Sequence, residues 1–416
     1  MNAPVEKNAP VENPEIVIGG FGAAGAATAL ALIKGGVAPQ SIVMFDSAPD
    51  AGGAKKGPDA RILALNAGSR RFLAALGVWE RLADEAWPMQ AIALSDTALE
   101  EEFRPLLLDM KSEAEDEPLA HLVPLGRLNE TLRALCREAG IRVVQAGLSG
   151  FRAGVDAIEV DLAGHSFRCK LLIGADGANS PIRLKAGIST HGWFYGQTAI
   201  VATIRHSLAH HGEAVQHFLP SGPFALLPLD EYRSSIVWSE KTAIANEIMA
   251  GDAASRKRAI EARAAGWRGD ILDVEAISAH PLQLKLSRRF IGDRLALVAD
   301  AAHVVHPLAG QGLNLGFEDA AMLAELIVER MRLGLDPGAP DLLEAYQGYR
   351  RPAALAMAAT TEAINRLFSN DVGPLRVLRD LGAGIINRLP GAKARLISAA
   401  AGHSRLSPRL FRGEAL

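Results

Sequence analysis

Apolar and polar positions follow two different periods along the chain. Near the N-terminus, the apolar run Ile16-Val17-Ile18 precedes a glycine-rich stretch and an alanine-rich segment that reaches about Lys34. A short apolar run, a glycine turn and a longer apolar segment predict a strand, a turn and a helix in that order. The run SIVMFD then predicts a second strand, which ends at Asp46.

Helical spacing returns in residues 61–82 and 126–140, and each of these segments predicts a helix. Between them, from about residue 87 to 122, the pattern weakens and acidic residues accumulate, so we expect a solvated loop or an edge there. Strands are predicted within 141–147 and 167–177, where short apolar runs end at glycine.

The middle of the chain changes to a period of two. From about His191 to Leu286, short alternating segments predict a mostly antiparallel sheet, which a helical segment near 243–266 interrupts. The apolar run at 294–299 predicts one more strand. The rest of the chain is predicted to be helical.

Composition limits the class of protein. The 416 residues suggest about two to three structural units, and 49% apolar with 22% charged residues indicate a globular chain. The net charge of −3 argues against nucleic acid as the main partner. Cys136 and Cys169 offer neither a disulfide framework nor zinc-ligand spacing, so we predict a reducing compartment and no metal site.

The N-terminus resembles neither a secretory signal nor a membrane anchor. It has no basic start followed by an apolar core, and no apolar run in the chain approaches the roughly 18 residues that span a bilayer. We therefore expect a cytoplasmic protein. Residues 1–14 carry the pentapeptide NAPVE twice, and their proline and polar content predicts a disordered lead-in.

The first glycine turn has the pattern GxGxxG, formed by Gly20, Gly22 and Gly25, and Asp46 follows 21 residues after Gly25. This spacing is typical of a dinucleotide-binding βαβ unit. The glycines permit the tight turn, the close approach of a pyrophosphate and helix–strand packing, in that order. Asp46 would accept hydrogen bonds from ribose hydroxyls. The alternative is a glycine-rich turn without a ligand, which the strand, the helix and the spaced acid together disfavour.

A second glycine-rich turn follows the strand at 294–299. In DAAHVVHPLAGQGLNLGFEDA, Asp300 stands at the strand end and GQGLN opens a helix. Gly310 and Gly312 would leave no side chain between the backbone and a ligand, Pro307 would stiffen the approach, and Asn314 is a candidate helix cap. We expect an electron-rich group to lie at this helix start.

Three fragments together carry a resemblance to a known family: GGFGAAG (19–25), GADGANSPIR (174–183) and VADAAHVVHPLAGQGLNLGFEDA (298–320). They resemble the FAD-dependent aromatic-ring hydroxylases with the p-hydroxybenzoate hydroxylase fold. The segments 59–79, 193–206, 218–229 and 378–402 look like the ubiquinone-biosynthesis monooxygenases of that family, of the 2-polyprenyl-6-methoxyphenol hydroxylase type. The HPLAGQGLNLG string is highly specific, whereas GxGxxG is not.

The resemblance implies an α/β fold, α+β overall. A Rossmann-like FAD-binding domain would be interleaved with a mostly antiparallel substrate domain and followed by a C-terminal helical region. We assign 15–85, 120–188 and 287–335 to the FAD-binding domain, 86–119 and 189–286 to the substrate domain, and 336–416 to the helical region.

The resemblance also implies residue roles. Gly20, Gly22 and Gly25 would bind the FAD pyrophosphate and Asp46 the adenosine ribose. Asp176 would support the pyrophosphate region and transient NAD(P)H docking, and Asp300 the ribityl side of FAD. The flavin ring is expected to lie against one turn, with two arginines near it. The turn residues are Pro307, Gly310, Gln311, Gly312 and Asn314, and the arginines are Arg61 and Arg127. A helix N-terminus there would stabilise negative charge on the reduced ring.

Two departures from the family pattern concern this site. Ala299-Asp300 stands where the family usually has Gly-Asp, which should be a mild change if φ at Ala299 is negative. Pro124-Leu125 stands where the family usually has Glu-Asn, which weakens the assignment of Arg127.

The implied reaction is a monooxygenation. NAD(P)H would reduce FAD, O2 would add to form a flavin hydroperoxide, and its distal oxygen would pass to the ring of a polyprenylated phenol. Because the chain has only one GxGxxG, NAD(P)H is expected to bind transiently near Arg61, Asp176 and Arg183. The alternatives are a hydroxylase of a small soluble aromatic, a flavin halogenase, a geranylgeranyl-reductase-like enzyme and a non-catalytic FAD-bound scaffold. A halogenase is disfavoured because no WxWxI string occurs.

No general base is obvious. His303 and His306 are candidates because histidine titrates near neutrality, and a packing or hydrogen-bonding role is the alternative for both. Tyr195 and His217 are weaker candidates. We hypothesise that no single side chain is an essential base, because the flavin performs the oxygen transfer.

The tail from Leu367 to Arg412 mixes apolar residues with arginines and one lysine. A basic amphipathic segment can contact the inner face of a membrane or a biosynthetic-complex partner. The alternative is a helix that packs on the protein with solvated arginines.

Overall fold

The structure is a computed structural model that describes residues 12–48, 61–96, 106–112, 117–369 and 407–416. Its first layer is a six-stranded sheet in the order β18-β19-β12-β1-β2-β8, in which only β18 pairs antiparallel. Every residue of β1 and β12 is buried, as is typical of a parallel sheet covered on both faces. The strands are β1 (Ile16–Gly19), β2 (Ile42–Asp46), β8 (Arg142–Gln145), β12 (Leu171–Gly174), β18 (Ile291–Gly292) and β19 (Leu295–Leu297).

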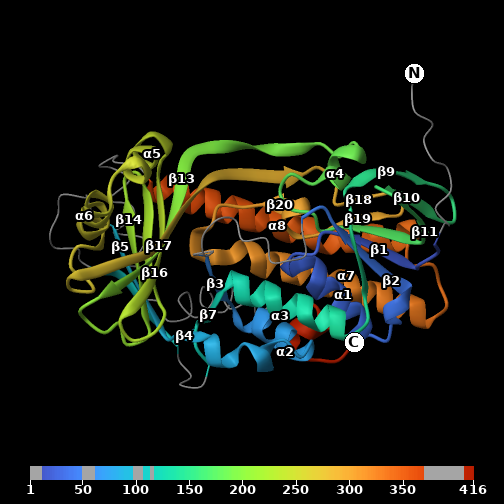
Figure 1. The fold of residues 1–416 in the computed structure, drawn as a ribbon, viewed down its shortest axis with the longest axis horizontal. Helices are drawn as coiled ribbons and strands as arrows, with labels where there is room; N and C mark the ends of the chain where they lie inside the picture. The colour runs from blue at the N-terminus through green and yellow to red at the C-terminus, as the bar shows by residue number, and fades with distance from the viewer. Residues whose placement is uncertain (1–11, 49–60, 97–105, 113–116, 370–406) are drawn as a thin grey trace.

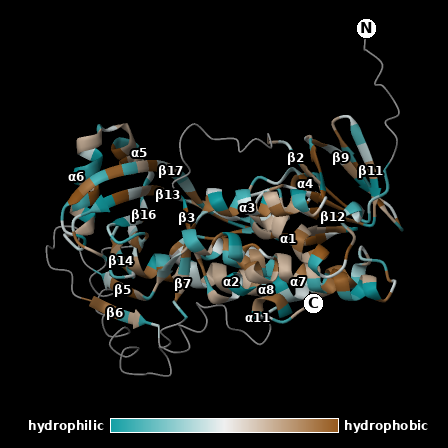
Figure 2. Cartoon of the chain, turned by 60° about the horizontal axis from the view of Figure 1, so that its bottom comes forward, coloured by the Kyte–Doolittle hydropathy of each residue, from teal (hydrophilic) through white to brown (hydrophobic). Residues whose placement is uncertain are grey.

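Long helices cover this sheet (Figure 1). Helix α1 (Ala23–Lys34) contacts both α3 (Leu125–Glu138) and α7 (Gln311–Arg332), and α7 contacts α8 (Pro340–Phe368). A small antiparallel sheet of β9 (Leu148–Ala153), β10 (Ile158–Leu162) and β11 (His165–Cys169) lies beside β1 and β12. Figure 2 shows apolar and polar stretches alternating along the helices, as expected for elements with one face in a core.

The second layer is an eight-stranded sheet in the order β20-β17-β13-β16-β15-β14-β5-β6, and every pairing except β14–β5 is antiparallel. Two strands of 17 residues each, β13 (Thr190–His206) and β17 (Ile271–Ser287), connect it to the first layer. In Figure 1 they cross the top of the molecule from α4 (Pro181–Lys185) to the far sheet. The remaining strands are β5 (Ala91–Asp96), β6 (Leu106–Lys111), β14 (Glu213–Leu219), β15 (Gly222–Pro228), β16 (Arg233–Lys241) and β20 (His303–Val304).

The far sheet has its own apolar core. Phe224 and Trp238 are fully buried there, and α5 (Thr242–Ala250) and α6 (Ala253–Ala264) pack against the long strands. The predicted fold class is therefore confirmed: a parallel nucleotide-binding sheet with helices, joined to a mostly antiparallel sheet. The helical interruption predicted near 243–266 corresponds to α5 and α6.

Two predicted segments differ from the structure. Residues 62–65 form β3 (Ile62–Leu65), and the helix α2 begins only at Ala67 (Ala67–Ala75), where the Asn66 side chain accepts from Ser69 N as the cap. The stretch at 87–122, expected as a solvated loop or an edge, contains β4 (Trp87–Met89), β5, β6 and β7 (Ala120–Pro124), and β6 is the edge strand of the eight-stranded sheet. Strand β7 pairs with both β3 and β4.

Most of the predicted lead-in and tail lies outside the described residues. The parts of these segments outside the described residues are 1–11 and 370–406. Glu12 exchanges backbone hydrogen bonds with Ser166 and Arg168, and α11 (Arg409–Arg412) packs against α2 and α7. Among the described helices, none combines the length and apolar character that crossing a bilayer requires.

Candidate functional site

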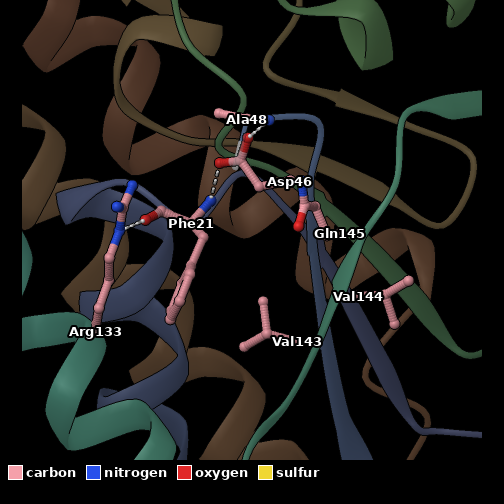
Figure 3. A pocket seen from close by; sticks show the side chains of 7 residues that line it. All are labelled: Phe21, Asp46, Ala48, Arg133, Val143, Val144 and Gln145. Carbon is pink, nitrogen blue, oxygen red and sulfur yellow. Dashed lines mark hydrogen bonds between the residues drawn. The ribbon is translucent and has the colours of Figure 1, made fainter. Parts of the chain in front are cut away.

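The carboxyl ends of β1 and β2 form a small recess beside α3 (Figure 3). Asp46 accepts from Phe21 N and Ala48 N, both at 2.8 Å, so its carboxylate is held at the mouth of the turn. Opposite it, Arg133 of α3 donates from Nε to the Phe21 carbonyl at 2.7 Å. Gln145, the residue paired with Asp46 on β8, completes the rim. A carboxylate and an amide beside an apolar floor suit the hydroxyls and the base of a nucleoside.

The three glycines of the first turn meet different surroundings. A Cβ on Gly20 would lie 2.3 Å from the Ala175 carbonyl oxygen, and φ there is +103°; a Cβ on Gly25 would lie 2.1 Å from the Gly20 oxygen. Both positions therefore require glycine for the fold itself. A Cβ on Gly22 would meet nothing within 4 Å. Gly22 thus borders open space at the N-terminus of α1, which has no side-chain cap and no acid in its first turn. These features fit a pyrophosphate.

Asp176 lies in the loop between β12 and α4. Its Oδ2 accepts from Ile182 N at 3.0 Å, while its Oδ1 is buried without a hydrogen-bond partner among the described residues. Burial raises the pKa of Asp176, against the opposing effect of hydrogen bonds from Ser180 and Ile182. The neighbouring Arg183 is only 3% exposed and donates to the carbonyls of Ala301 and Ala178. Arg183 therefore joins two loops and presents little surface to a docking nucleotide.

The Ala299-Asp300 turn is strained in a way that the sequence did not predict. Ala299 has φ +53°, so the condition under which this departure would be mild is not met, and alanine occupies a left-handed conformation that favours glycine. The Ala299 amide donates to Asp319 Oδ2 at 3.0 Å, which holds the turn. Asp300 is solvent-exposed, yet the surrounding protein raises its pKa, and His303 and Arg61 partly offset this. This combination is expected of a carboxylate on the floor of a recess.

A buried charge cluster supports that turn from below. Asp319 is fully buried and accepts from His303 Nε2 at 2.5 Å and from Arg350 Nε at 2.7 Å. Burial alone would raise the pKa of Asp319, but His303 and Arg350 hold it below its usual range. Arg350 also pairs with Glu318 at 3.0 Å. The candidate base His303 is thus bound to a structural carboxylate and is itself 2% exposed.

The GQGLN turn begins α7 as predicted, but its cap differs. Gly310 is the N-cap, with φ +66°, and α7 has no side-chain cap and no acid in its first turn. Asn314 lies one turn further along and instead donates from Nδ2 to the Ala64 carbonyl and accepts from Asn66 N. It therefore attaches α7 to β3. A Cβ on Gly312 would meet nothing within 4 Å, so the helix start borders open space, as a flavin ring requires.

Two arginines were predicted near the flavin ring. Arg61 immediately precedes β3, which lies beside Gly310, and Arg61 acts on the pKa of Asp300. Arg127 stands on an exposed face of α3, where it pairs with Glu85 and Glu130, both at 2.7 Å. The first residue of α3, Leu125, donates from its backbone N to the Arg61 carbonyl at 3.0 Å.

His306, the second candidate base, is fully buried just before the GQGLN turn. Its ring lies edge-on to Tyr195 with centroids 5.0 Å apart. Burial lowers its pKa to about 4, so the imidazole is neutral at physiological pH. His217 is distant in the fold, in the far sheet, where Nδ1 is 2.5 Å from Ser95 Oγ.

Sequence reasoning missed several residues of this site. Arg133 could have been found, since it lies two turns after Arg127 on the same predicted helix. Asp319 and Arg350 could not, because they are 31 residues apart and meet only when α7 packs on α8. Glu362 of α8, which adds to the effect of burial in raising the pKa of Tyr195, is not marked by any local sequence pattern either.

Comparisons with known proteins agree with this geometry. The family of the FAD binding domain matches residues 13–361. Ubiquinone hydroxylase UbiL of Rhodospirillum rubrum is 38% identical over 405 residues, which cover 96% of this chain and 92% of that protein. The chain belongs to the FAD-dependent ubiquinone-biosynthesis hydroxylases. Escherichia coli 3-demethoxyubiquinol 3-hydroxylase is 32% identical, with 90% of this chain and 96% of that protein covered.

Solved structures show the same fold for this ubiquinone-biosynthesis hydroxylase. p-Nitrophenol 4-monooxygenase PnpA of Pseudomonas putida superposes with a TM-score of 0.75 at 19% identity, covering 95% of this chain and all of that one. PqsL of P. aeruginosa has a TM-score of 0.75 at 20% identity, covering 90% and 100%. These structures show the shared fold, and the family match and the curated relatives identify an FAD-dependent hydroxylase, as the sequence resemblance implied.

Proposed function

We propose that this hydroxylase uses NAD(P)H and O2 to hydroxylate a polyprenylated phenol on the route to ubiquinone. The observation that carries the proposal is the end-to-end likeness to UbiL, a protein named for ubiquinone hydroxylation. The site supports it, because Gly22 and Gly312 both border open space at the starts of α1 and α7, and neither helix start has a side-chain cap or an acid in its first turn.

The residues of the chain bind and orient in this proposal. Asp46 and the amides at the start of α1 hold the adenosine and pyrophosphate end, and Asp300 holds the ribityl side. The uncapped N-terminus of α7 directs its amides at the flavin position and stabilises negative charge there. When bound, FAD supplies hydride acceptance from NAD(P)H and the activation of O2. The protein positions the ring and excludes water.

NAD(P)H is proposed to dock without a dinucleotide domain of its own. The chain has one GxGxxG, and of the three residues expected near the nicotinamide nucleotide, Arg183 is buried. Arg61 and Asp176 therefore remain the proposed docking residues. We predict that Arg61→Met raises the KM for NAD(P)H, measured by initial rates of FAD reduction, whereas Arg183→Met chiefly lowers thermal stability.

The first test is the quinone and phenol profile of lipid extracts from cells that lack the gene. Loss of ubiquinone with accumulation of an under-hydroxylated polyprenylphenol supports the proposal. An unchanged profile, in cells without a redundant hydroxylase, assigns the protein to a small soluble aromatic instead. If substrate does not stimulate NAD(P)H oxidation by the purified protein with any phenol, the protein is a non-catalytic FAD-bound scaffold.

Membrane contact through the basic tail stays a prediction. Most of the tail lies outside the described residues, and its described arginines make ion pairs within the chain: Arg366 with Glu362, Arg409 with Glu325 and Glu329, and Arg412 with Glu414. Sedimentation with anionic liposomes, before and after removal of residues 370–416, tests it. Equal sedimentation of both forms contradicts a membrane role for the tail.

A further inference from the structure

Buried polar side chains meet where the flavin-side turn, β13 and α8 converge. His306 is fully buried, and neither ring nitrogen has a hydrogen-bond partner among the described residues. The Tyr195 hydroxyl and Glu362 Oε2 are also buried; they are near enough for Glu362, as a hydrogen-bond partner, to add to the effect of burial in raising the pKa of Tyr195, but neither atom has a hydrogen bond of good geometry in the described part of the chain. Buried polar atoms in folded proteins are nearly always hydrogen-bonded. Orphan atoms from three separate elements therefore indicate a missing partner at their meeting point.

The protonation of this cluster defines what it can bind. Burial lowers the pKa of His306 to about 4, with Glu362 opposing, so the ring carries one donor and one acceptor. Burial, and then Glu362, raises the pKa of Tyr195, so its hydroxyl keeps its proton. Arg366 binds the other oxygen of Glu362. The cluster thus offers both donors and acceptors, and its nearest carboxylate disfavours an anionic ligand.

The walls around the cluster are apolar. Leu284, Val305 and Ala358 are buried there, and Tyr195 and Met357 pack against them. Two residues before Tyr195 on β13, Trp193 is 37% exposed and its ring centroid lies 6.2 Å from that of Tyr195, so the apolar surface continues outward from the cluster. A hydrogen-bonding end inside an apolar wall suits an aromatic ring that carries a hydroxyl and an apolar substituent.

We propose that His306, Tyr195 and Glu362 form a hydrogen-bonding group for the aromatic substrate and hold the ring hydroxyl of a neutral phenol. This inference rests on the proposed function and names the residues that orient its substrate. The neutral imidazole accepts from the phenol hydroxyl, and its other nitrogen donates within the cluster. With the ligand bound, the Tyr195 hydroxyl donates its hydrogen bond to Glu362. No proton is transferred, so the set positions the ring and does not act as a base.

A comparison of ligands and variants tests the inference directly. The FAD-loaded protein is titrated with a short-chain 2-prenylphenol and with the matching prenylbenzene that lacks the hydroxyl, and Kd is read from flavin absorbance. A buried hydroxyl with its partners is worth about 1–3 kcal/mol, or about a five- to hundred-fold tighter Kd for the phenol in the wild type. In His306→Leu this ratio should fall toward one, and in Tyr195→Phe it should fall partly.

The controls separate binding from folding. Tyr349→Phe changes an exposed tyrosine, 49% exposed and on the same helix as Glu362, and should keep the wild-type ratio. FAD content and Tm show whether each variant is folded. Because the readout is the effect of one ligand hydroxyl, a general loss of packing does not change it.

Each outcome decides one question. If the wild-type ratio is about one, or stays unchanged in both His306→Leu and Tyr195→Phe, the inference is overturned, and the orphan atoms bind water. If the wild type binds only soluble phenols, the proposed polyprenyl substrate is wrong. The same comparison with a soluble phenol and its deoxy analogue then still decides whether the cluster holds a ring hydroxyl.

Discussion

Asp319 should contribute more to stability than its single charge suggests. The substitution Asp319→Asn preserves shape but leaves Arg350, 3% exposed, and His303, 2% exposed, without their buried carboxylate. Removing one member of a buried charge pair costs about 3–5 kcal/mol. With an unfolding entropy of about 2.1 cal/mol/K per residue and 416 residues, this lowers Tm by about 3–6 °C. Asp319 also accepts from the Ala299 amide, so the FAD Kd should rise about tenfold or more.

The matched control is Asp341→Asn. Asp341 pairs with Arg330 at 2.6 Å, but its side chain is 68% exposed, and exposed pairs contribute about 0–1 kcal/mol. Thermal unfolding of the FAD-free proteins measures both variants, and fluorescence titration measures FAD binding. If Asp319→Asn unfolds within 1 °C of the control and binds FAD as tightly, the cluster does not support the turn, and the reasoning fails.

Three further predictions concern backbone and charge. Gly22→Ala should leave the Tm of the FAD-free protein unchanged but weaken FAD binding in a titration. Gly25→Ala should lower Tm, because its Cβ would lie 2.1 Å from a carbonyl oxygen. If both variants show the same changes in Tm and FAD binding, Gly22 does not border the pyrophosphate. Ala299→Gly should change the free energy of unfolding by about 1 kcal/mol or less. Ala299→Val should lower it strongly, because a β-branched residue is disfavoured at the φ of +53°. The His306 pKa of about 4 lies below 6.5, so its contribution to stability is present above pH 6.5 and is lost as the pH falls toward 4. Between pH 7.5 and 5.0, FAD-free His306→Leu should therefore lose about 2 kcal/mol less than the wild type in thermal unfolding, and parallel curves refute this.

The sequence predicted those parts of the fold whose signals are local. Strand β1, helix α1 and the GQGLN helix start all carry short-range patterns of apolar residues and glycine. Strand β3 was missed because its four residues precede a helix without a breaker, and only pairing with β7 makes them extended. Strand β5 was missed because it pairs with β14, about 120 residues later in the sequence, and β6 is held at the sheet edge by its pairing with β5.

The site residues were predictable where a sequence motif specifies the backbone conformation. They were not predictable where their position depends on packing between elements that are distant in the sequence. The positions of Gly20 and Gly310 follow from left-handed turns that glycine enters easily, and that of Gly25 from the close approach of the Gly20 carbonyl. The left-handed Ala299 was unpredictable, because the Asp319 carboxylate that holds it comes from a helix 20 residues away. Glu362 joins His306 only through the packing of α8.

The pairing of β13 with β17 has a consequence for how this family diversifies. Thr190 and Ser287 are cross-strand neighbours at the base of the two strands, so the chain leaves the nucleotide-binding layer and returns to it at nearly the same point. Residues 190–287 can therefore change in length or sequence without shifting the register of β12 against β19. Strands β5, β6 and β20 complete the same sheet from outside this segment. A graft of residues 190–287 between relatives should thus carry Tyr195 with it and leave His306 and Glu362 to the recipient, which separates their contributions to the choice of ring.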